Sequence, residues 1–156
     1  MRTLMRDLLL QQMKACFEGD AWYGPSLMLL LTELDVQRAG ARPIASGHSA
    51  WEIVLHITTW KRVATERLRR KAATSVADDE DWPAVTDISE SAWKQAITAL
   101  RDAQQDLIKA VAEINDDSEM SRGIAGTSYN VGFLLMGIVE HDLYHTGQIA
   151  LLAKHR

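Results

Sequence analysis

The sequence predicts an all-α protein built as a bundle of long amphipathic helices. Apolar residues recur at steps of three and four along most of the chain, and capping-box patterns precede two of these stretches. The composition agrees, because 47% of the residues are hydrophobic although few are aromatic. A length of 156 residues predicts a single domain, residues 1–156, which is long enough to bury a proper core.

The first helix is expected at residues 3–18. Its apolar face carries Leu4, Leu8 and Ala15, with Met5, Leu9 and Cys16 beside them. Gly24 and Pro25 prevent this helix from continuing, because proline lacks an amide hydrogen and crowds the preceding turn. A second segment is expected to begin near Pro25. Its buried stripe would consist of Leu27, Leu30, Leu31 and Leu34.

Residues 40–47 are rich in glycine, alanine, proline and serine, and they are expected to connect to a long helix at residues 49–71. Ser49 and Glu52 form a capping-box pattern at the start of that helix. Its inward face carries Ile53, His56, Ile57, Trp60, Ala64 and Leu68.

Residues 72–87 contain four consecutive acidic residues and Pro83 without a helical stripe, so we expect a loop there. Sixteen extended residues reach about 50 Å, which exceeds the length of roughly 35 Å of the helix before them. The loop can therefore return along the whole bundle. The helices on either side of it would then run parallel.

The third long helix is expected to begin at the capping-box-like pair Asp87 and Glu90 and to end near residue 114. A regular apolar stripe runs along it, and Gln104 is the single polar residue that interrupts the stripe. Residues 115–128 form a turn-rich connection to the last helix.

The final helix is expected to begin near Tyr129, with Ser128 as its cap. One inward stripe follows the helical spacing, and three consecutive members of it are polar. The stripe consists of Leu134, Ile138, His141, His145, Gln148 and Leu152. Burying polar groups without partners costs about 1–3 kcal/mol each. A bound metal ion is the simplest reason to keep two imidazoles and an amide in these positions.

His141 and His145 lie four residues apart, so both side chains can reach one ion. His56 is the natural third ligand, because it is the only other histidine on an inward stripe and no other titratable residue is expected to face inward. Three imidazoles without a carboxylate leave coordination positions open, as in catalytic sites. Zinc or nickel fits best, and iron or manganese is also compatible. The alternative is that these histidines are hydrogen-bonded core residues.

Several residues near the histidine pair could have either a functional or a structural role. Gln148 could donate to a ligand of the metal or be a core amide, and Tyr144 could orient a ligand or fill a helix interface. Asp142 completes a His-Asp-x-x-His run similar to the metalloprotease pattern, but we expect it on the solvated side or holding an imidazole. Glu140 is expected on the surface, and Cys16 is expected to serve packing.

The composition also excludes some classes of partner. A formal net charge of −4 disfavours nucleic-acid binding, and the longest apolar run, residues 27–31, is too short to cross a membrane. The single cysteine cannot form an intramolecular disulfide, and the first residues lack the unbroken apolar run of a signal peptide. These features predict a cytoplasmic protein.

Three segments, AWYGPSL, HSAWEIVLHITTW and EHDLYHTGQIALL, resemble the DinB-like (DinB/YfiT) superfamily of metalloenzymes. The resemblance covers most of the chain. It implies a four-helix bundle of up-down-down-up topology, commonly a homodimer. It also implies a divalent metal ion bound by three histidines that match His56, His141 and His145.

Characterised members of that family include bacillithiol transferases, a mycothiol-dependent maleylpyruvate isomerase and glutathione-using enzymes. The resemblance therefore suggests a metal-dependent transferase that joins a low-molecular-weight thiol to a small-molecule substrate. A metal-dependent hydrolase is the first alternative. A non-catalytic helical stress-response or interaction protein, with structural histidines, is the second.

Overall fold

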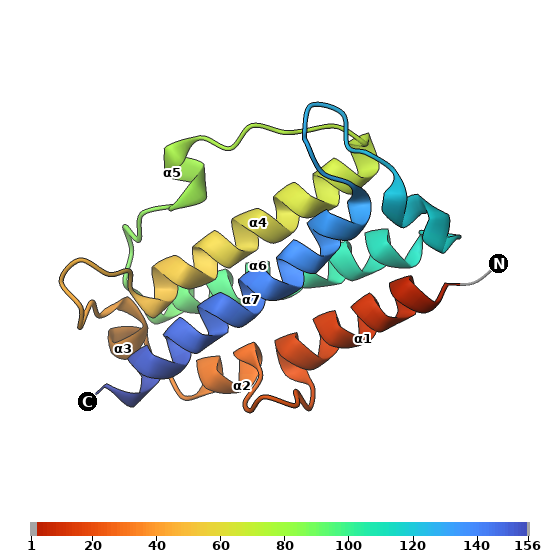
Figure 1. The fold of residues 1–156 in the computed structure, drawn as a ribbon. Coiled ribbons are helices and arrows are strands. Elements are labelled where there is room, and N and C mark those ends of the chain that lie inside the picture. Colours follow the sequence, from red (N-terminus) through yellow and green to blue (C-terminus); the bar gives the residue numbers. More distant parts are fainter. Residues whose placement is uncertain (1–2, 156) are drawn as a thin grey trace.

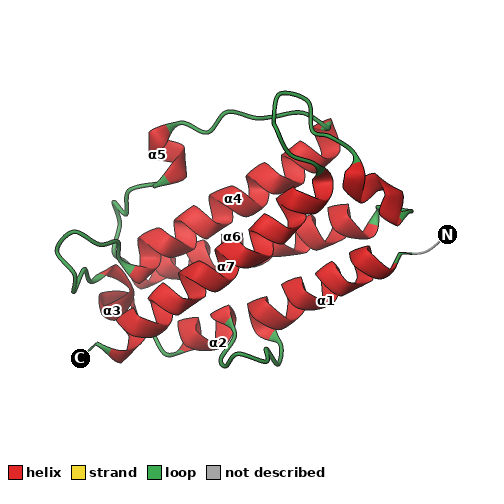
Figure 2. Ribbon diagram, in the orientation of Figure 1, coloured by secondary structure: helices red, strands yellow, loops and turns green. Residues whose placement is uncertain are grey.

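The computed structural model describes residues 3–155 and is helical, which confirms the all-α prediction (Figure 2). Four long helices form the body of the protein: α1 (Leu4–Glu18), α4 (Ala50–Arg70), α6 (Glu90–Ala112) and α7 (Val131–Lys154). Four short elements lie in the connections: α2 (Leu27–Thr32), α3 (Val36–Gly40), α5 (Asp78–Asp81) and the 3-10 helix η1 (Asp117–Ser121). Within the described part of the chain, no helix is both long and apolar enough to cross a bilayer.

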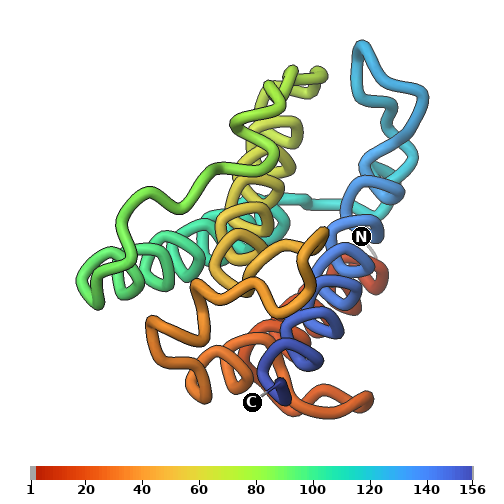
Figure 3. The backbone as a smooth tube through the Cα atoms, turned by 90° about the vertical axis from the view of Figure 1, so that its left-hand side faces the viewer, coloured from red at the N-terminus to blue at the C-terminus, as the bar shows by residue number. Residues whose placement is uncertain are grey.

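The long helices pack around a shared interior. α4 packs against α6 and α7, and α1 packs against the same two helices from the other side. Figure 1 shows α4 and α6 running in one direction, and α1 and α7 in the opposite direction. The segment between α4 and α6 lies outside the bundle beside α4 in both views (Figures 1 and 3). Our expectation of a plain loop there was incomplete, because this segment contains the single turn α5.

Side-chain caps set the helix starts. α4 begins as expected, with the reciprocal hydrogen bonds of a capping box between Ser49 and Glu52. The predicted caps of α6 and α7 were wrong by two residues. Ser89 caps α6 and Asn130 caps α7, because each is extended and accepts from the amide three residues ahead. Asp87 instead accepts a hydrogen bond from the amide of Ser89.

The buried face of the first helix is centred on Leu9 and Cys16, which were expected beside the apolar face, and not on Leu4 and Leu8. Leu4 and Leu8 are 71% and 50% exposed, whereas Leu9, Met13 and Cys16 are buried. The four leucines of the stripe predicted for the second segment are buried. They are Leu27, Leu30, Leu31 and Leu34.

The interior has two apolar clusters, one toward each end of the bundle. One cluster contains Ile57 of α4 and Leu100 of α6. The other contains Ala64 of α4 and Leu107 of α6. Between them lies a set of buried polar side chains that we call the central polar layer. Its members are His56, Lys61, Gln104, Asp142 and His145. The candidate functional residues therefore lie mid-bundle, between two hydrophobic clusters that fix the positions of the helices.

Candidate metal centre

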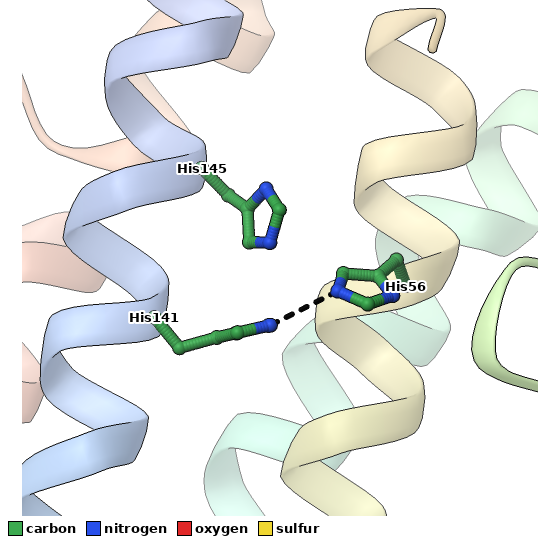
Figure 4. A group of neighbouring side chains, drawn as sticks. All are labelled: His56, His141 and His145. Carbon is green, nitrogen blue, oxygen red and sulfur yellow. Dashed lines mark hydrogen bonds between the residues drawn. The ribbon is translucent and has the colours of Figure 1, made fainter. Parts of the chain in front are cut away.

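Three histidines meet between α4 and α7. His56 extends from α4 toward His141 and His145, which lie one turn apart on α7 (Figure 4). The Nε2 atoms of His56 and His141 are 3.0 Å apart. One ring nitrogen from each of the three residues lies within 4.8 Å of the other two. The structure thus brings together the three residues that the sequence singled out.

The opposite ring nitrogens of two histidines have hydrogen-bond acceptors as partners. His56 Nδ1 donates to the main-chain carbonyl of Asp81 at 2.7 Å, and His145 Nδ1 donates to Oε1 of Gln148 at 2.6 Å. A carbonyl oxygen can only accept, so each Nδ1 carries the ring proton and each Nε2 keeps its lone pair. Such outer partners fix the tautomer and orientation of metal-binding histidines.

His141 is held differently. Its Nδ1 is buried and has no hydrogen-bond partner among the described residues. Burial, with His145, His56 and Lys61 adding smaller effects, lowers the pKa of His141 to about 3. Burial also lowers the pKa of His145, although its bond to Gln148 opposes this shift. His141 and His145 are therefore neutral near pH 7, the state that a metal ligand requires.

The cluster fits a divalent metal ion. Ligand nitrogens about 2.0–2.1 Å from a tetrahedral ion lie roughly 3.3 Å apart, close to the 3.0 Å between His56 and His141. The donor set consists of three imidazoles, which suits zinc, nickel and iron alike.

Trp82, directly after α5, covers the side of the cluster. Its indole stacks on His56 at 3.8 Å between ring centroids and on His48 at 3.6 Å, with both pairs 6° from parallel. Asp81 also ties α5 to α4, because its carboxylate accepts a hydrogen bond from the indole nitrogen of Trp60 at 2.7 Å. Sequence reasoning missed Trp82 and Asp81, since the acidic segment that contains them has no helical stripe.

Gln148 and Tyr144 are both adjacent to His145. Gln148 bonds its ring, as described, so it contacts a candidate ligand rather than a main-chain group. Tyr144 is 66% exposed and packs edge-on against His145, with ring centroids 5.0 Å apart. Glu140 is exposed, as predicted.

The expectation for Asp142 was wrong. Its side chain is buried and forms a salt bridge with Lys61 of α4, which is 1% exposed. Lys61 also donates to Oε1 of Gln104 at 2.7 Å, and Gln104 donates to the main-chain carbonyl of Met13 at 3.0 Å. Burial raises the pKa of Asp142, and Lys61 opposes that shift. The expectation that no further titratable residue faces inward was therefore wrong as well.

The helical period contained the signal for this buried pair. Lys61 follows Ile57 by four residues and precedes Ala64 by three, and both neighbours are fully buried. Asp142 follows the buried Ile138 by four residues. Gln104 interrupts the apolar stripe of the third long helix. A buried amide needs hydrogen-bond partners, so polar residues could have been expected at the same height on the neighbouring helices.

Comparison with known proteins identifies one family. The model of the DinB superfamily matches residues 26–149, a range that includes all three clustered histidines. No curated protein and no solved structure matches the chain significantly.

Proposed function

The chain belongs to the DinB superfamily, and on this premise we propose that His56, His141 and His145 hold a divalent metal ion in a catalytic site. The observation that carries the proposal is the convergence of three imidazole nitrogens without a carboxylate among them. Such a donor set leaves coordination positions free for a substrate. Zinc or nickel is the proposed ion, with iron or manganese as alternatives.

We propose that the reaction transfers a low-molecular-weight thiol to a small electrophilic substrate. A bound divalent ion would lower the pKa of a thiol, so that the sulfur attacks as thiolate. Asp81 and Gln148 would orient the imidazoles of His56 and His145 through hydrogen bonds to Nδ1. Trp82 shields His56 by stacking on its ring. Tyr144 would contact the substrate, because it is exposed beside His145.

The carboxylates near the histidines are engaged by other residues, and this favours thiol transfer over hydrolysis. Hydrolysis by an activated water is usually assisted by a carboxylate base near the open position. Asp142 instead forms a buried salt bridge with Lys61. Asp81 lies at the Nδ1 side of His56 and accepts from Trp60. A thiol that ionises on the metal needs no further base.

Two assays test this proposal. Protein loaded with zinc or nickel should conjugate glutathione, bacillithiol or mycothiol to monochlorobimane. His141→Ala should abolish the reaction, whereas Lys94→Ala, at an exposed lysine of α6, should preserve it. If the protein hydrolyses 4-nitrophenyl acetate without any thiol, and does so faster than it conjugates a thiol to monochlorobimane, the hydrolase is favoured instead. Failure of the wild-type protein to retain any ion would contradict both enzyme functions and leave the non-catalytic interaction protein.

We also propose that the protein is a cytoplasmic homodimer. A reducing compartment suits a thiol-using enzyme, and Cys16 is free and buried. Exposed apolar side chains along one side of α7 supply a surface for a second copy. They are Phe133 and Met136. Light scattering should give twice the chain mass, and Phe133→Glu should reduce it to the monomer mass.

A further inference from the structure

A cavity of about 540 Å³ lies beside the histidine cluster, within the roughly 300–1,000 Å³ range of small-molecule sites. It is enclosed by the start of α4, the end of α7 and the connection before α4. Ile53, on its α4 wall, precedes His56 by one helical turn. Gln148, on its α7 wall, follows His145 by one turn. The cavity is therefore adjacent to the candidate metal centre on both helices.

The chemistry of the cavity wall is mainly apolar. Ile44, Ile53, Leu151 and Leu152 line it. Among the described residues, no lysine, arginine, aspartate or glutamate does so. An uncharged apolar group would be stabilised there by about 25 cal/mol per Å² of surface removed from water. A charged group would lose its hydration without a partner of opposite charge.

Gln148 is one of four polar side chains in the cavity wall, with Ser46, His48 and His155. Its Oε1 is occupied by His145 Nδ1, and no described residue accepts from its Nε2 amide. Since an amide nitrogen only donates, Gln148 can supply a hydrogen-bond donor to a ligand in the cavity, at the end nearest the candidate metal centre. His48 forms another part of the wall and connects it to His56 through the stacked indole of Trp82.

The outer wall is formed by a defined turn. The amide of Gly47 donates to the carbonyl of Ile44 at 2.9 Å. A Cβ atom at position 47 would lie 3.2 Å from Cβ of Ile44, so glycine allows the turn to close tightly. Ile44 itself is 58% exposed, so replacing it costs little core packing. This residue is a suitable place to test the cavity.

We propose that this cavity binds the apolar part of the substrate, and that it selects uncharged molecules with a hydrogen-bond acceptor such as a carbonyl. The inference rests on the proposed function, because it assigns the substrate class of the same site. Gln148 Nε2 would donate to the acceptor and hold the molecule at the end of the cavity next to the histidines. A substrate with a charge on its apolar body would be rejected.

The test uses Prodan, an uncharged naphthyl ketone whose fluorescence shifts to the blue in apolar surroundings. The full chain should bind Prodan with a blue shift. Ile44→Asp should weaken binding at least tenfold, because the carboxylate lies in the apolar wall. Ile88→Asp is the matched control, since Ile88 is 61% exposed and lies outside the cavity. Its affinity should equal that of the wild type.

A second variant tests the donor. In Gln148→Glu a carboxylate oxygen can still accept from His145, but the amide that would donate to the ketone is lost. Prodan affinity should fall several-fold, while metal content stays at the wild-type value. Unchanged affinity in this variant would contradict the donor role. No Prodan binding to the wild type, or equal losses in Ile44→Asp and Ile88→Asp, would overturn the inference.

The readouts separate this inference from the proposed function. Prodan binding needs neither metal nor thiol, so it can be measured on protein treated with a chelator. If the protein conjugates thiols but does not bind Prodan in this cavity, only the inference fails. If Prodan binds as described but no ion is retained, the proposed function fails and the cavity remains a binding site.

Discussion

Replacing Lys61 by methionine should strongly destabilise the metal-free protein. Lys61 is 1% exposed and is the salt-bridge partner of Asp142, whose other carboxylate oxygen has no hydrogen-bond partner within residues 3–155. Methionine keeps most of the side-chain volume but leaves the buried carboxylate unpaired. Removing one partner of a buried ion pair costs about 3–5 kcal/mol. Urea unfolding at pH 7.5, followed by circular dichroism, measures the loss in unfolding free energy.

The penalty should also depend on pH. Without Lys61, burial alone acts on Asp142, so its pKa in the folded state rises further above the unfolded value of about 3.9. A group with a raised folded pKa stabilises the fold at low pH, and this contribution is lost as pH rises through the folded pKa. The difference between wild type and Lys61→Met should therefore be smaller at pH 5 than at pH 7.5.

Two further variants show whether the unpaired charge is the cause. Lys61→Met combined with Asp142→Leu should recover most of the loss, because no charge is then left buried. Lys94→Met is the surface control, since Lys94 has a 78% exposed side chain and a single weak ion pair. It should change stability by less than about 0.5 kcal/mol. A loss below about 1 kcal/mol for Lys61→Met, or a penalty independent of pH, would refute the reasoning.

Three other outcomes are expected. Gln148→Ala should weaken zinc binding about 10- to 100-fold by titration calorimetry, because His145 loses its partner. Asp81→Ala should change it little, since the main-chain carbonyl still orients the imidazole; equal effects would contradict these roles. With chelator present, stability should fall as pH drops from about 6.5 toward 3. The folded state keeps His141 neutral while the unfolded state binds a proton, and His141→Leu should flatten this dependence. Ser49→Ala should cost about 1 kcal/mol in urea unfolding by removing the α4 cap, and no loss would contradict the capping role.

The sequence alone predicted the features that depend on the hydrophobic period of a helix or on a local cap. The start of α4 follows from Ser49 and Glu52 because a capping box depends on residues three positions apart. The grouping of His56, His141 and His145 followed from their positions on inward stripes. The first inference needs only the geometry of one helix, and the second adds that the inward stripes of two helices face the same core.

Other parts of the site depend on contacts that no local pattern encodes. Trp82 stacks on His56 because the segment after α4 returns along the bundle, and nothing within that acidic segment specifies the register. Leu4 and Leu8 could not be assigned to the surface, since the rotation of α1 depends on what α6 and α7 present to it. Lys61 was overlooked because a lysine at a core position is stable only with a partner from a distant helix.

The most direct measurement is anomalous diffraction from crystals of the wild-type protein grown with zinc, recorded at the zinc absorption edge. One peak is expected between α4 and α7, about 2.0–2.1 Å from a nitrogen of each of His56, His141 and His145. A peak that contacts fewer than these three imidazoles, or zinc bound only at surface residues, would contradict the three-histidine metal centre.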